Sequence, residues 1–268
     1  MAGSCILGHI SDPIIIGIGI DDDPRRVIEG IATYKGYSHI VVYAHHHLRD
    51  DIPQHLQSVF SDHPEEELIS DLYSGTLHAA IRGTLTSHHT LQVLKKYAGV
   101  TKLQRVVLLE TKNGTRFLLA PVGIDEGWTI EEKVSLIEQV RPLCKKFGLS
   151  DQVTVLSGGR LEDVGRHPMV DRSLADAELV SRLTGSVHRG ILIEEAIKDS
   201  GFILAPDGIV GNLIFRTLLF LGQGRSHGAP VLNIGKIFID TSRVNPNYFH
   251  ALNLADHLIE LSFSEKHS

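Results

Sequence analysis

Short apolar runs alternate with segments of helical pattern along almost the whole chain, and this alternation restricts the fold more than any other feature. The runs Ile14–Ile20, Ile40–Ala44 and Val153–Leu156 have the length and β-branched content of buried strands. One intervening segment, Thr129–Phe147, opens with a capping-box pattern and is followed by the stop signal Gly148. Strands that alternate with helices predict a mainly parallel sheet with helices on both faces.

The length of 268 residues suits one large domain or two small ones. The segment Pro121–Trp128 is the best boundary by composition, because glycines and a proline stand there between two strand–helix blocks. We therefore expect two α/β lobes rather than one large sheet.

Charge and cysteine content exclude several classes of protein. The net charge is -6 and no basic run occurs, which argues against nucleic acid as a partner. Only Cys5 and Cys144 are present and neither belongs to a CxxC pair, so neither a zinc–cysteine site nor a disulfide framework is expected. No apolar run is long enough to cross a membrane and no signal-peptide pattern opens the chain. These features predict a cytoplasmic protein without membrane contact.

Polar residues and glycines follow a predicted strand at Phe202–Ala205. The residues that could bind a ligand there are Asp207, Gly211 and Asn212, which open an apolar helix. Glycines let backbone N–H groups approach a ligand, and a helix N-terminus favours negative charge. The alternative is a plain strand-to-helix turn in which Asp207 or Asn212 caps the helix.

Two more strand ends carry cations and hydroxyl groups. Ser242 and Arg243 follow the strand that ends at Asp240, and Arg82-Gly83-Thr84 follows the strand His78–Ile81. An arginine can bind two oxygens of a phosphate or carboxylate while a serine hydroxyl orients the group. Each arginine could instead cap a helix or form a surface ion pair. Because open α/β sheets bind ligands at the carboxyl ends of their strands, the three strand ends together predict an anion site.

Histidine-rich segments are weak candidates for a metal site. His45–His47 and His88-His89 are consecutive residues that would point in different directions on an extended loop, so surface loops are the favoured interpretation and no metal site is expected. A metal-dependent decarboxylating dehydrogenase is a weaker alternative, because it needs several carboxylates that bind one divalent ion. The acidic clusters Asp21–Asp23 and Asp50-Asp51 are the candidates for those ligands. Both are typical of solvated loops or helix caps.

A nucleotide site near the N-terminus is also weakly supported. The segment Gly17-Ile-Gly19-Ile-Asp21-Asp22 has two of the three glycines of the GxGxxG pattern, and Asp22 stands where the third would be.

Together these motifs resemble the phosphate acetyl- and butyryltransferases. The resemblance rests on Tyr73–Thr86 and on a closing series, Ala205–Asn212, Gly228–Pro230 and Thr241–Arg243, whose order and spacing match the family. It covers roughly residues 66 to 260. Within that superfamily the chain is most similar to the MtxX branch of methanogenic archaea, whose name associates it with methyl transfer. The Ile-Gly-Ile-Gly start, the Ala-Ile-Arg-Gly-Thr-Leu turn and the Asp-Gly-Ile-Val-Gly-Asn loop carry this narrower likeness.

The resemblance implies a two-lobed α/β/α sandwich of the isocitrate and isopropylmalate dehydrogenase type, with the site in the cleft between lobes. Residues 1–122 with 229–268 would form the first lobe, and residues 123–228 the second. The family moves acyl groups between coenzyme A and phosphate, and its members are usually homodimers. Ser242 and Arg243 would then be catalytic, and a set of strand-end residues would bind the substrate. That set is Arg82, Gly83, Thr84, Asp207, Gly211 and Asn212.

Two departures from the family pattern leave the reaction open. Gln92 stands where family members carry a helix arginine, and no carboxylate follows Arg243 until Asp256, although family members often have an acid soon after the Ser-Arg pair. One hypothesis is an acyl- or phosphoryl-type transferase that acts on a phosphate, acyl phosphate or coenzyme A ligand. The other is a methyltransferase, or a non-catalytic accessory subunit of a methyl-transfer complex, in methanogen metabolism.

Overall fold

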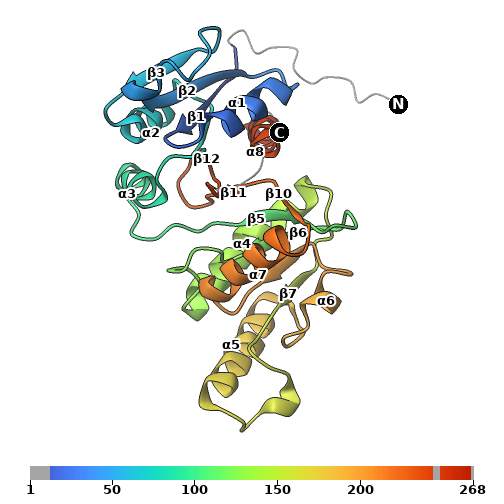
Figure 1. Ribbon diagram of the computed structural model, residues 1–268. Coiled ribbons are helices and arrows are strands. Elements are labelled where there is room, and N and C mark those ends of the chain that lie inside the picture. Colours follow the sequence, from blue (N-terminus) through green and yellow to red (C-terminus); the bar gives the residue numbers. More distant parts are fainter. Residues whose placement is uncertain (1–12, 244–247, 267–268) are drawn as a thin grey trace. The chain divides into compact units, whose positions relative to one another are not determined.

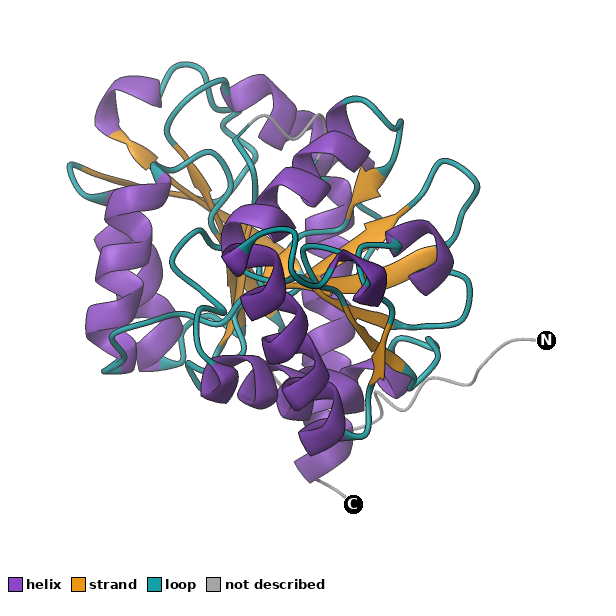
Figure 2. Ribbon diagram, turned by 90° about the horizontal axis from the view of Figure 1, so that it is seen from below, coloured by secondary structure: helices purple, strands orange, loops and turns teal. Residues whose placement is uncertain are grey.

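The computed structural model describes residues 13–243 and 248–266 and divides into two compact units. The first unit comprises Met1–Tyr97 and Lys236–Ser268, and the second comprises Ala98–Gly235. Each unit is a sheet covered by helices (Figures 1 and 2). The predicted α/β fold class is confirmed. Within the described ranges, no helix has an apolar stretch long enough to cross a bilayer.

The boundary between the units differs from the one expected from composition. Strands β5 (Val107–Glu110) and β6 (Arg116–Ala120) form an antiparallel hairpin, and β6 pairs in parallel with β9 (Phe202–Leu204) in the second unit. Residues 98–122, which the sequence analysis assigned to the first lobe, therefore belong to the second unit, as do residues 229–235. The proline- and glycine-containing segment at 121–128 is a turn inside the second unit.

Five strands of the first unit lie in the order β12-β4-β1-β2-β3, and every pair among them is parallel. Their bounds are β1 Ile15–Ile20, β2 His39–His45, β3 Ser58–Ser61, β4 Ala79–Ile81 and β12 Ile237–Asp240. The helices are α1 Pro24–Thr33, α2 Pro64–Ser74, α3 Ser87–Ala98 and α8 Phe249–Lys266, with a short 3-10 helix at His46–Leu48. The parallel arrangement matters because it places all five carboxyl ends at one edge.

The Ile-Gly-Ile-Gly segment of β1 is a packing feature. Its isoleucines are fully buried on one face, whereas Gly17 faces α2, where an added Cβ would come within 2.6 Å of Leu68 Cδ1. A Cβ on Gly19 would overlap the Leu85 side chain. Both glycines therefore let neighbouring elements approach the sheet closely, which is a sufficient reason for their presence.

The sheet of the second unit is mixed and has the order β10-β5-β6-β9-β7-β8. Strands β6, β9, β7 and β8 are parallel to one another, and β10 and β5 are joined in antiparallel pairs. The remaining strands of this sheet are β7 Val153–Val155, β8 Val187–His188 and β10 Arg225–Ser226. The short strand β11, Ala229–Pro230, belongs to this chain segment but pairs in the other sheet, next to β12. The helices are α4 Ile130–Lys146, α5 Pro168–Thr184, α6 Ile193–Ala196 and α7 Gly208–Phe220, with a short 3-10 helix at Leu161–Asp163.

The helix start predicted at Thr129 is confirmed, and the cap differs in one bond from a standard capping box because Glu132 accepts from the residue before the N-cap. The Thr129 hydroxyl accepts a hydrogen bond from the Glu132 N–H at 3.1 Å, and the Glu132 carboxylate accepts from the Trp128 N–H at 2.8 Å. The C-terminal helix α8 runs from Phe249 to Lys266. Cys5 and Asn245 lie outside the described residues.

Candidate functional site

Three loops meet at the carboxyl edge of the first unit's sheet. Because β12, β4 and β1 are adjacent and parallel, the loops that follow them are neighbours. These loops are Asp21–Asp23, Arg82–Thr84 and Thr241–Arg243, and we call them the strand-end cluster. Five of the predicted site residues are brought together here, as the sequence analysis expected for these strand ends.

Hydroxyl groups join the three loops to one another. The Thr84 hydroxyl accepts hydrogen bonds from the backbone N–H groups of Asp21 and Asp22 at 3.0 and 3.2 Å. The Thr241 hydroxyl donates to the Gly83 carbonyl oxygen at 2.9 Å. Gly83 has a φ of +62°, and an added Cβ would overlap the carbonyl oxygen of Gly19, so no other residue fits there without displacing β1. Gly83, Thr84 and Thr241 thus fix the shape of the cluster.

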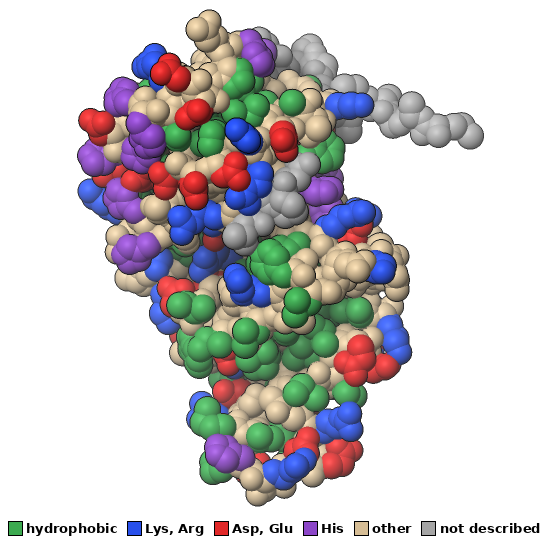
Figure 3. Space-filling model, in the orientation of Figure 1, with side chains coloured by type: hydrophobic (Ala, Val, Ile, Leu, Met, Phe, Trp, Pro, Cys, Tyr) green, Lys and Arg blue, Asp and Glu red, His purple; other side chains and the backbone are tan. Residues whose placement is uncertain are grey.

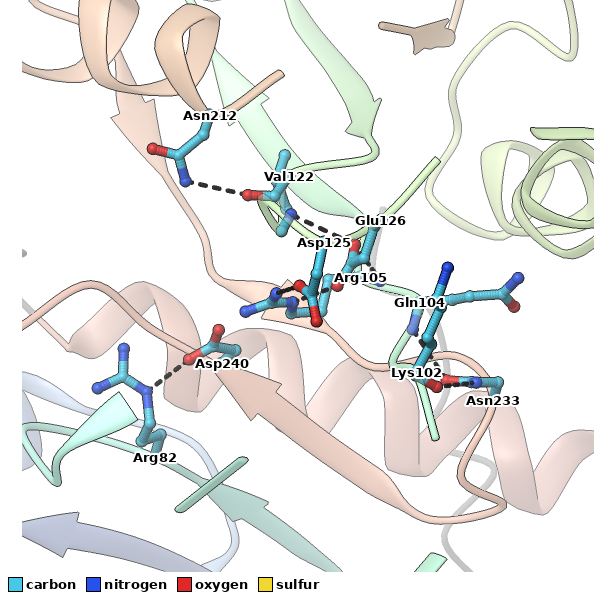
Figure 4. A network of polar contacts seen from close by, with 11 residues as sticks. Arg82, Lys102, Gln104, Arg105, Val122, Asp125, Glu126, Asn212, Asn233 and Asp240 are labelled. Carbon is cyan, nitrogen blue, oxygen red and sulfur yellow. Dashed lines mark hydrogen bonds and ion pairs between the residues drawn. The ribbon is translucent and has the colours of Figure 1, made fainter. Parts of the chain in front are cut away.

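Arg82 is buried and engaged within the first unit. Its Nε donates to the Asp240 carboxylate at 2.5 Å and its Nη1 donates to the Leu85 carbonyl oxygen at 2.6 Å (Figure 4). The Arg82 side chain is 5% exposed, so this pair is an internal link between the ends of β4 and β12. A buried arginine with a carboxylate partner has its charge largely compensated.

Ser242 and Arg243 lie at the accessible side of the cluster. Ser242 is half-buried and Arg243 is exposed. Their backbone is held from two directions, because the Tyr248 hydroxyl donates to the Ser242 carbonyl oxygen at 3.3 Å and Arg26 Nη1 donates to the Arg243 carbonyl oxygen at 3.2 Å. Burial raises the pKa of Tyr248 to about 12, so its hydroxyl stays protonated as a donor.

The charges of the cluster leave one cation available. Arg82 faces Asp240, and Arg26 Nε lies 2.7 Å from an Asp23 carboxylate oxygen. Among the residues that the structure describes, the Arg243 guanidinium has no carboxylate partner. Arg243 and the preceding Ser242 therefore offer a guanidinium and a hydroxyl, the kinds of donor that bind the oxygens of an anion.

The histidine-rich segment ends close to the same edge. His45 is the last residue of β2, and its Nε2 lies 3.5 Å from an Asp21 carboxylate oxygen, whereas His46 and His47 are exposed. Within residues 13–243 and 248–266, no group of three His, Cys, Asp or Glu side chains is arranged to hold a metal ion.

The other three predicted residues lie in the second unit, at the start of α7. Asp207 is the N-cap, and its carboxylate accepts from the Val210 N–H at 2.9 Å. Asn212 Nδ2 donates to the Val122 carbonyl oxygen at 3.0 Å (Figure 4). An added Cβ on Gly211 would overlap the Pro121 carbonyl oxygen, so this glycine lets α7 pack against the turn after β6. Locally, this is the capped strand-to-helix turn that the sequence analysis kept as its alternative.

Glu126 is a buried carboxylate that the sequence analysis did not select. It accepts from Arg105 Nε at 2.6 Å and from the backbone N–H of Gly123 at 3.3 Å, and it is 2% exposed. Burial raises the pKa of this carboxyl, against the opposing effect of Arg105. Because the Glu126 carbonyl oxygen also accepts from the Gly208 N–H at 3.0 Å, Glu126 shapes the turn on which α7 begins.

Lys133, on α4, is a second residue that was missed. Its amine is nearly buried, and Nζ lies 3.7 Å from an Asp176 carboxylate oxygen. Burial lowers the pKa of Lys133, while the charges of Asp176 and Asp207 oppose that shift. The signal was present in the sequence, because Lys133 lies on the buried stripe of α4 and is its one cation. The other buried residues of that stripe are Leu136, Ile137, Val140 and Cys144.

Neither Gln92 nor Asp256 supplies the group that the family pattern leads one to expect. Gln92 is exposed on α3. Asp256 is buried on α8, where its carboxylate accepts from the hydroxyl groups of Tyr34 and Ser38, both at 2.5 Å. Asp256 therefore links α8 to the region around α1 and is not the missing acid of the Ser242–Arg243 pair.

Comparison with known proteins identifies the family. No family model matches the chain. A Methanosarcina barkeri protein named "Putative methyltransferase mtx subunit X" is 43% identical over 254 residues, which cover 92% of this chain and 94% of that protein. The chain belongs to the MtxX family.

The fold of this MtxX-family chain is shared with better-known enzymes. A branched-chain phosphotransacylase from Enterococcus faecalis superposes with a TM-score of 0.73 at 17% identity, covering 92% of this chain and 99% of that one. A beta-decarboxylating dehydrogenase from Thermococcus kodakarensis superposes with a TM-score of 0.54 at 12% identity, covering 91% and 83%. Such identities show the fold alone. The predicted two-lobed fold of the phosphotransacylase and isocitrate dehydrogenase type is confirmed.

Proposed function

We propose that this MtxX-family chain is a transferase-like protein that binds an anionic ligand through Ser242 and Arg243. The ligand class is phosphate, an acyl phosphate or the phosphate groups of coenzyme A. The observation that supports this proposal is the exposed Arg243 side chain, which has no carboxylate partner in the described residues and follows Ser242 on a backbone that Tyr248 and Arg26 hold by hydrogen bonds.

The chemistry of acyl transfer suits such a pair. When an acyl group passes from phosphate to a thiol, the carbonyl oxygen carries negative charge in the transition state and phosphate leaves as an anion. Donors that are already oriented stabilise both charges at little reorganisation cost. Because the main chain at Ser242 and Arg243 is hydrogen-bonded on both sides, ordering these side chains around a ligand costs less entropy than it would on a free loop.

A binding and turnover experiment tests the proposal. Inorganic phosphate and coenzyme A are titrated by calorimetry, and acyl-CoA formation is followed with acetyl, propionyl and butyryl phosphate. Removing a charged hydrogen-bond donor should weaken binding roughly 10- to 100-fold in Arg243→Ala. The matched control is Arg225→Ala, because Arg225 is an exposed arginine paired with Glu110. Wild-type protein without affinity for any of these ligands, or an Arg243→Ala protein with unchanged affinity, would refute the proposal.

We further propose a homodimer formed through α7. This helix leaves an apolar stripe exposed, with Leu213 59% and Leu221 80% exposed, and Ile209 and Phe220 on the same stripe. Hydrophobic side chains gather over α7 in the space-filling view (Figure 3). Arg216 is the cation of this stripe, and its guanidinium lies over the Phe220 ring. A surface so apolar and so poor in charge is typical of a permanent interface.

The dimer and the alternative function predict different partners for this surface. Light scattering should show a dimer for the wild-type chain and a monomer for Leu213→Glu, while Leu179→Glu, at an exposed leucine of α5, controls for added charge. The alternative is an accessory subunit of a methyl-transfer complex, which the name of the Methanosarcina relative favours. Three results together would favour the complex over the dimer. The pure chain would be monomeric, the wild type would co-purify with methyltransferase subunits from a methanogen, and the Leu213→Glu variant would not co-purify with them.

A further inference from the structure

A serine, a histidine and a glutamate form a hydrogen-bonded chain in the second unit, and none of the three is among the site residues that the sequence analysis selected. Ser157 follows β7, His188 ends the adjacent parallel strand β8, and Glu178 lies on α5, which packs on both strands. The Ser157 hydroxyl oxygen is 2.8 Å from His188 Nε2. His188 Nδ1 is 3.3 Å from a Glu178 carboxylate oxygen.

We propose that Ser157, His188 and Glu178 form a second reactive site, with Ser157 as an acyl-accepting nucleophile toward small carboxylic esters or thioesters. A nucleophile within hydrogen-bond reach of a base, which a third group orients, is the arrangement that activates a serine. His188 is the general base, and Glu178 is a positioning residue that acts through His188. The site lies within one unit and does not depend on the proposed function of Ser242 and Arg243.

Burial favours this chemistry over an incidental surface contact. Ser157 is 2% exposed and the His188 side chain is 7% exposed, whereas the Glu178 side chain is 42% exposed. The hydrogen bond to His188, followed by the one to Arg182, holds the pKa of Glu178 below its usual range, so the acid stays ionised next to the imidazole. The ionised carboxylate can accept the hydrogen on His188 Nδ1, which would leave Nε2 free to accept from Ser157.

The hydroxyl hydrogen of Ser157 has two acceptors, and they define two states. One is His188 Nε2, and the other is the Gly159 carbonyl oxygen at 2.9 Å. When the imidazole is neutral with its hydrogen on Nδ1, facing Glu178, Ser157 donates to Nε2 and is activated. When both nitrogens carry hydrogen, Nε2 donates to Ser157, which then donates to Gly159. The first state is the reactive one.

In the reaction, the Ser157 oxygen bonds to the carbonyl carbon while its proton passes to His188 Nε2. The bond from that carbon to the alcohol or thiol breaks, and the leaving group takes the proton from Nε2. Water then attacks the acyl-serine in the same way, and Ser157 regains its hydrogen. Gly158 and Gly159 follow Ser157 directly, and Gly158 is exposed, so no side chain of these two residues blocks an approach to the hydroxyl.

Covalent labelling tests the site. The full-length protein is treated with a fluorophosphonate, the adduct is located by mass spectrometry, and p-nitrophenyl acetate hydrolysis is followed in parallel. We expect the adduct on Ser157. His188→Gln should slow both reactions by about 100-fold or more, because a positioned general base contributes at least that much. Ser200→Ala is the control: Ser200 is a buried serine whose hydroxyl lies 2.7 Å from that of Thr154, with no histidine in the pair.

Two further variants separate catalysis from a structural role. Glu178→Gln should slow labelling at Ser157 with little change in melting temperature, and Glu178→Asp should restore part of the rate. If Ser157→Ala does not fold, site mapping on the wild type and the rate of His188→Gln still decide the question. The absence of an adduct on Ser157, or an adduct that forms equally fast in folded His188→Gln, would overturn the proposal.

Discussion

The two units use similar sequence motifs at their strand ends for different structural purposes. In the first unit, side chains after the strands hold neighbouring loops together: the Thr84 and Thr241 hydroxyls bond the backbone of adjacent loops, and Arg82 links β4 to β12. In the second unit, glycines after β9 serve close packing, because Gly208 and Gly211 let α7 lie against the turn after β6. A glycine and a polar residue after a strand therefore indicate a tight connection, and the contacts of each residue decide whether it can also bind a ligand.

This difference determines which groups face outward. In the first unit Arg82 is already bonded to Asp240, so Ser242 and Arg243 remain as the candidate ligand-binding residues. In the second unit Asp207 and Asn212 are bonded to the backbone, and the unusual group nearby is the buried amine of Lys133. Four substitutions test the comparison, and the largest effect is expected at the buried arginine Arg82.

Replacing Arg82 by leucine should lower the free energy of unfolding by about 3–5 kcal/mol. The change removes one partner of a buried ion pair and leaves the Asp240 charge inside without the guanidinium. Urea unfolding followed by circular dichroism measures the loss. Arg225→Leu is the control and should cost less than about 1 kcal/mol, because the Arg225 side chain is 66% exposed. A loss below about 1 kcal/mol in Arg82→Leu would show that the link between β4 and β12 contributes little.

Gly211→Ala should destabilise the second unit by about 1–3 kcal/mol, since an added methyl group overlaps the Pro121 carbonyl oxygen and forces α7 from the turn. Helix propensity alone predicts the opposite sign, because alanine is favoured over glycine by up to about 1 kcal/mol in a helix. Thr217→Ala, at an exposed position of the same helix, is the control and should be neutral or stabilising. If Gly211→Ala is more stable than the wild type, close packing against Pro121 is not the reason why a glycine stands at this position.

The sequence predicted the architecture better than the roles of individual residues. Apolar runs and caps located most elements, because those signals are local, as the Thr129 cap of α4 shows. The β5–β6 hairpin was not identified from the sequence, although Asn113-Gly114, a strong hairpin-turn signal, lies between its strands. Alternation of strands and helices alone does not reveal that an adjacent pair of strands is antiparallel.

Residue roles depend on partners that are distant in the chain. Whether Gly211 binds a ligand or packs is decided by Pro121, and the engagement of Arg82 is decided by Asp240. The chain of Ser157, His188 and Glu178 has no spacing that marks it in the sequence, because the pairing of β7 with β8 brings these residues together.

Lys133→Met should change how stability depends on pH. Burial lowers the pKa of Lys133 in the folded protein, whereas the unfolded value is the ordinary 10.5. Between these two values the unfolded chain binds a proton that the folded chain does not, so the free energy of unfolding rises with pH across this window. The gain is complete once the pH exceeds 10.5.

Urea unfolding of the wild type and Lys133→Met at several pH values up to about 10.5 measures this dependence. The difference between the two proteins cancels the contributions of groups that titrate in both. Lys198→Met is the control, because the Lys198 side chain is 64% exposed and paired with Glu195. A difference curve that stays flat over the window, or falls with pH, would contradict a lowered pKa for Lys133.

The smallest effect on stability is expected at Arg243, and this contrast with Arg82 is the most informative. Both arginines follow parallel neighbouring strands, but Arg243 is exposed and its backbone, rather than its side chain, makes the described hydrogen bond. Arg243→Ala should change the free energy of unfolding by less than about 0.5 kcal/mol, the usual range for surface substitutions. If the same variant also loses phosphate or coenzyme A binding, one arginine of the strand-end cluster serves the fold and the other serves the ligand. A loss of stability comparable to that of Arg82→Leu would instead show that Arg243 has a structural role like that of Arg82. The proposed anion site would then lack its available cation.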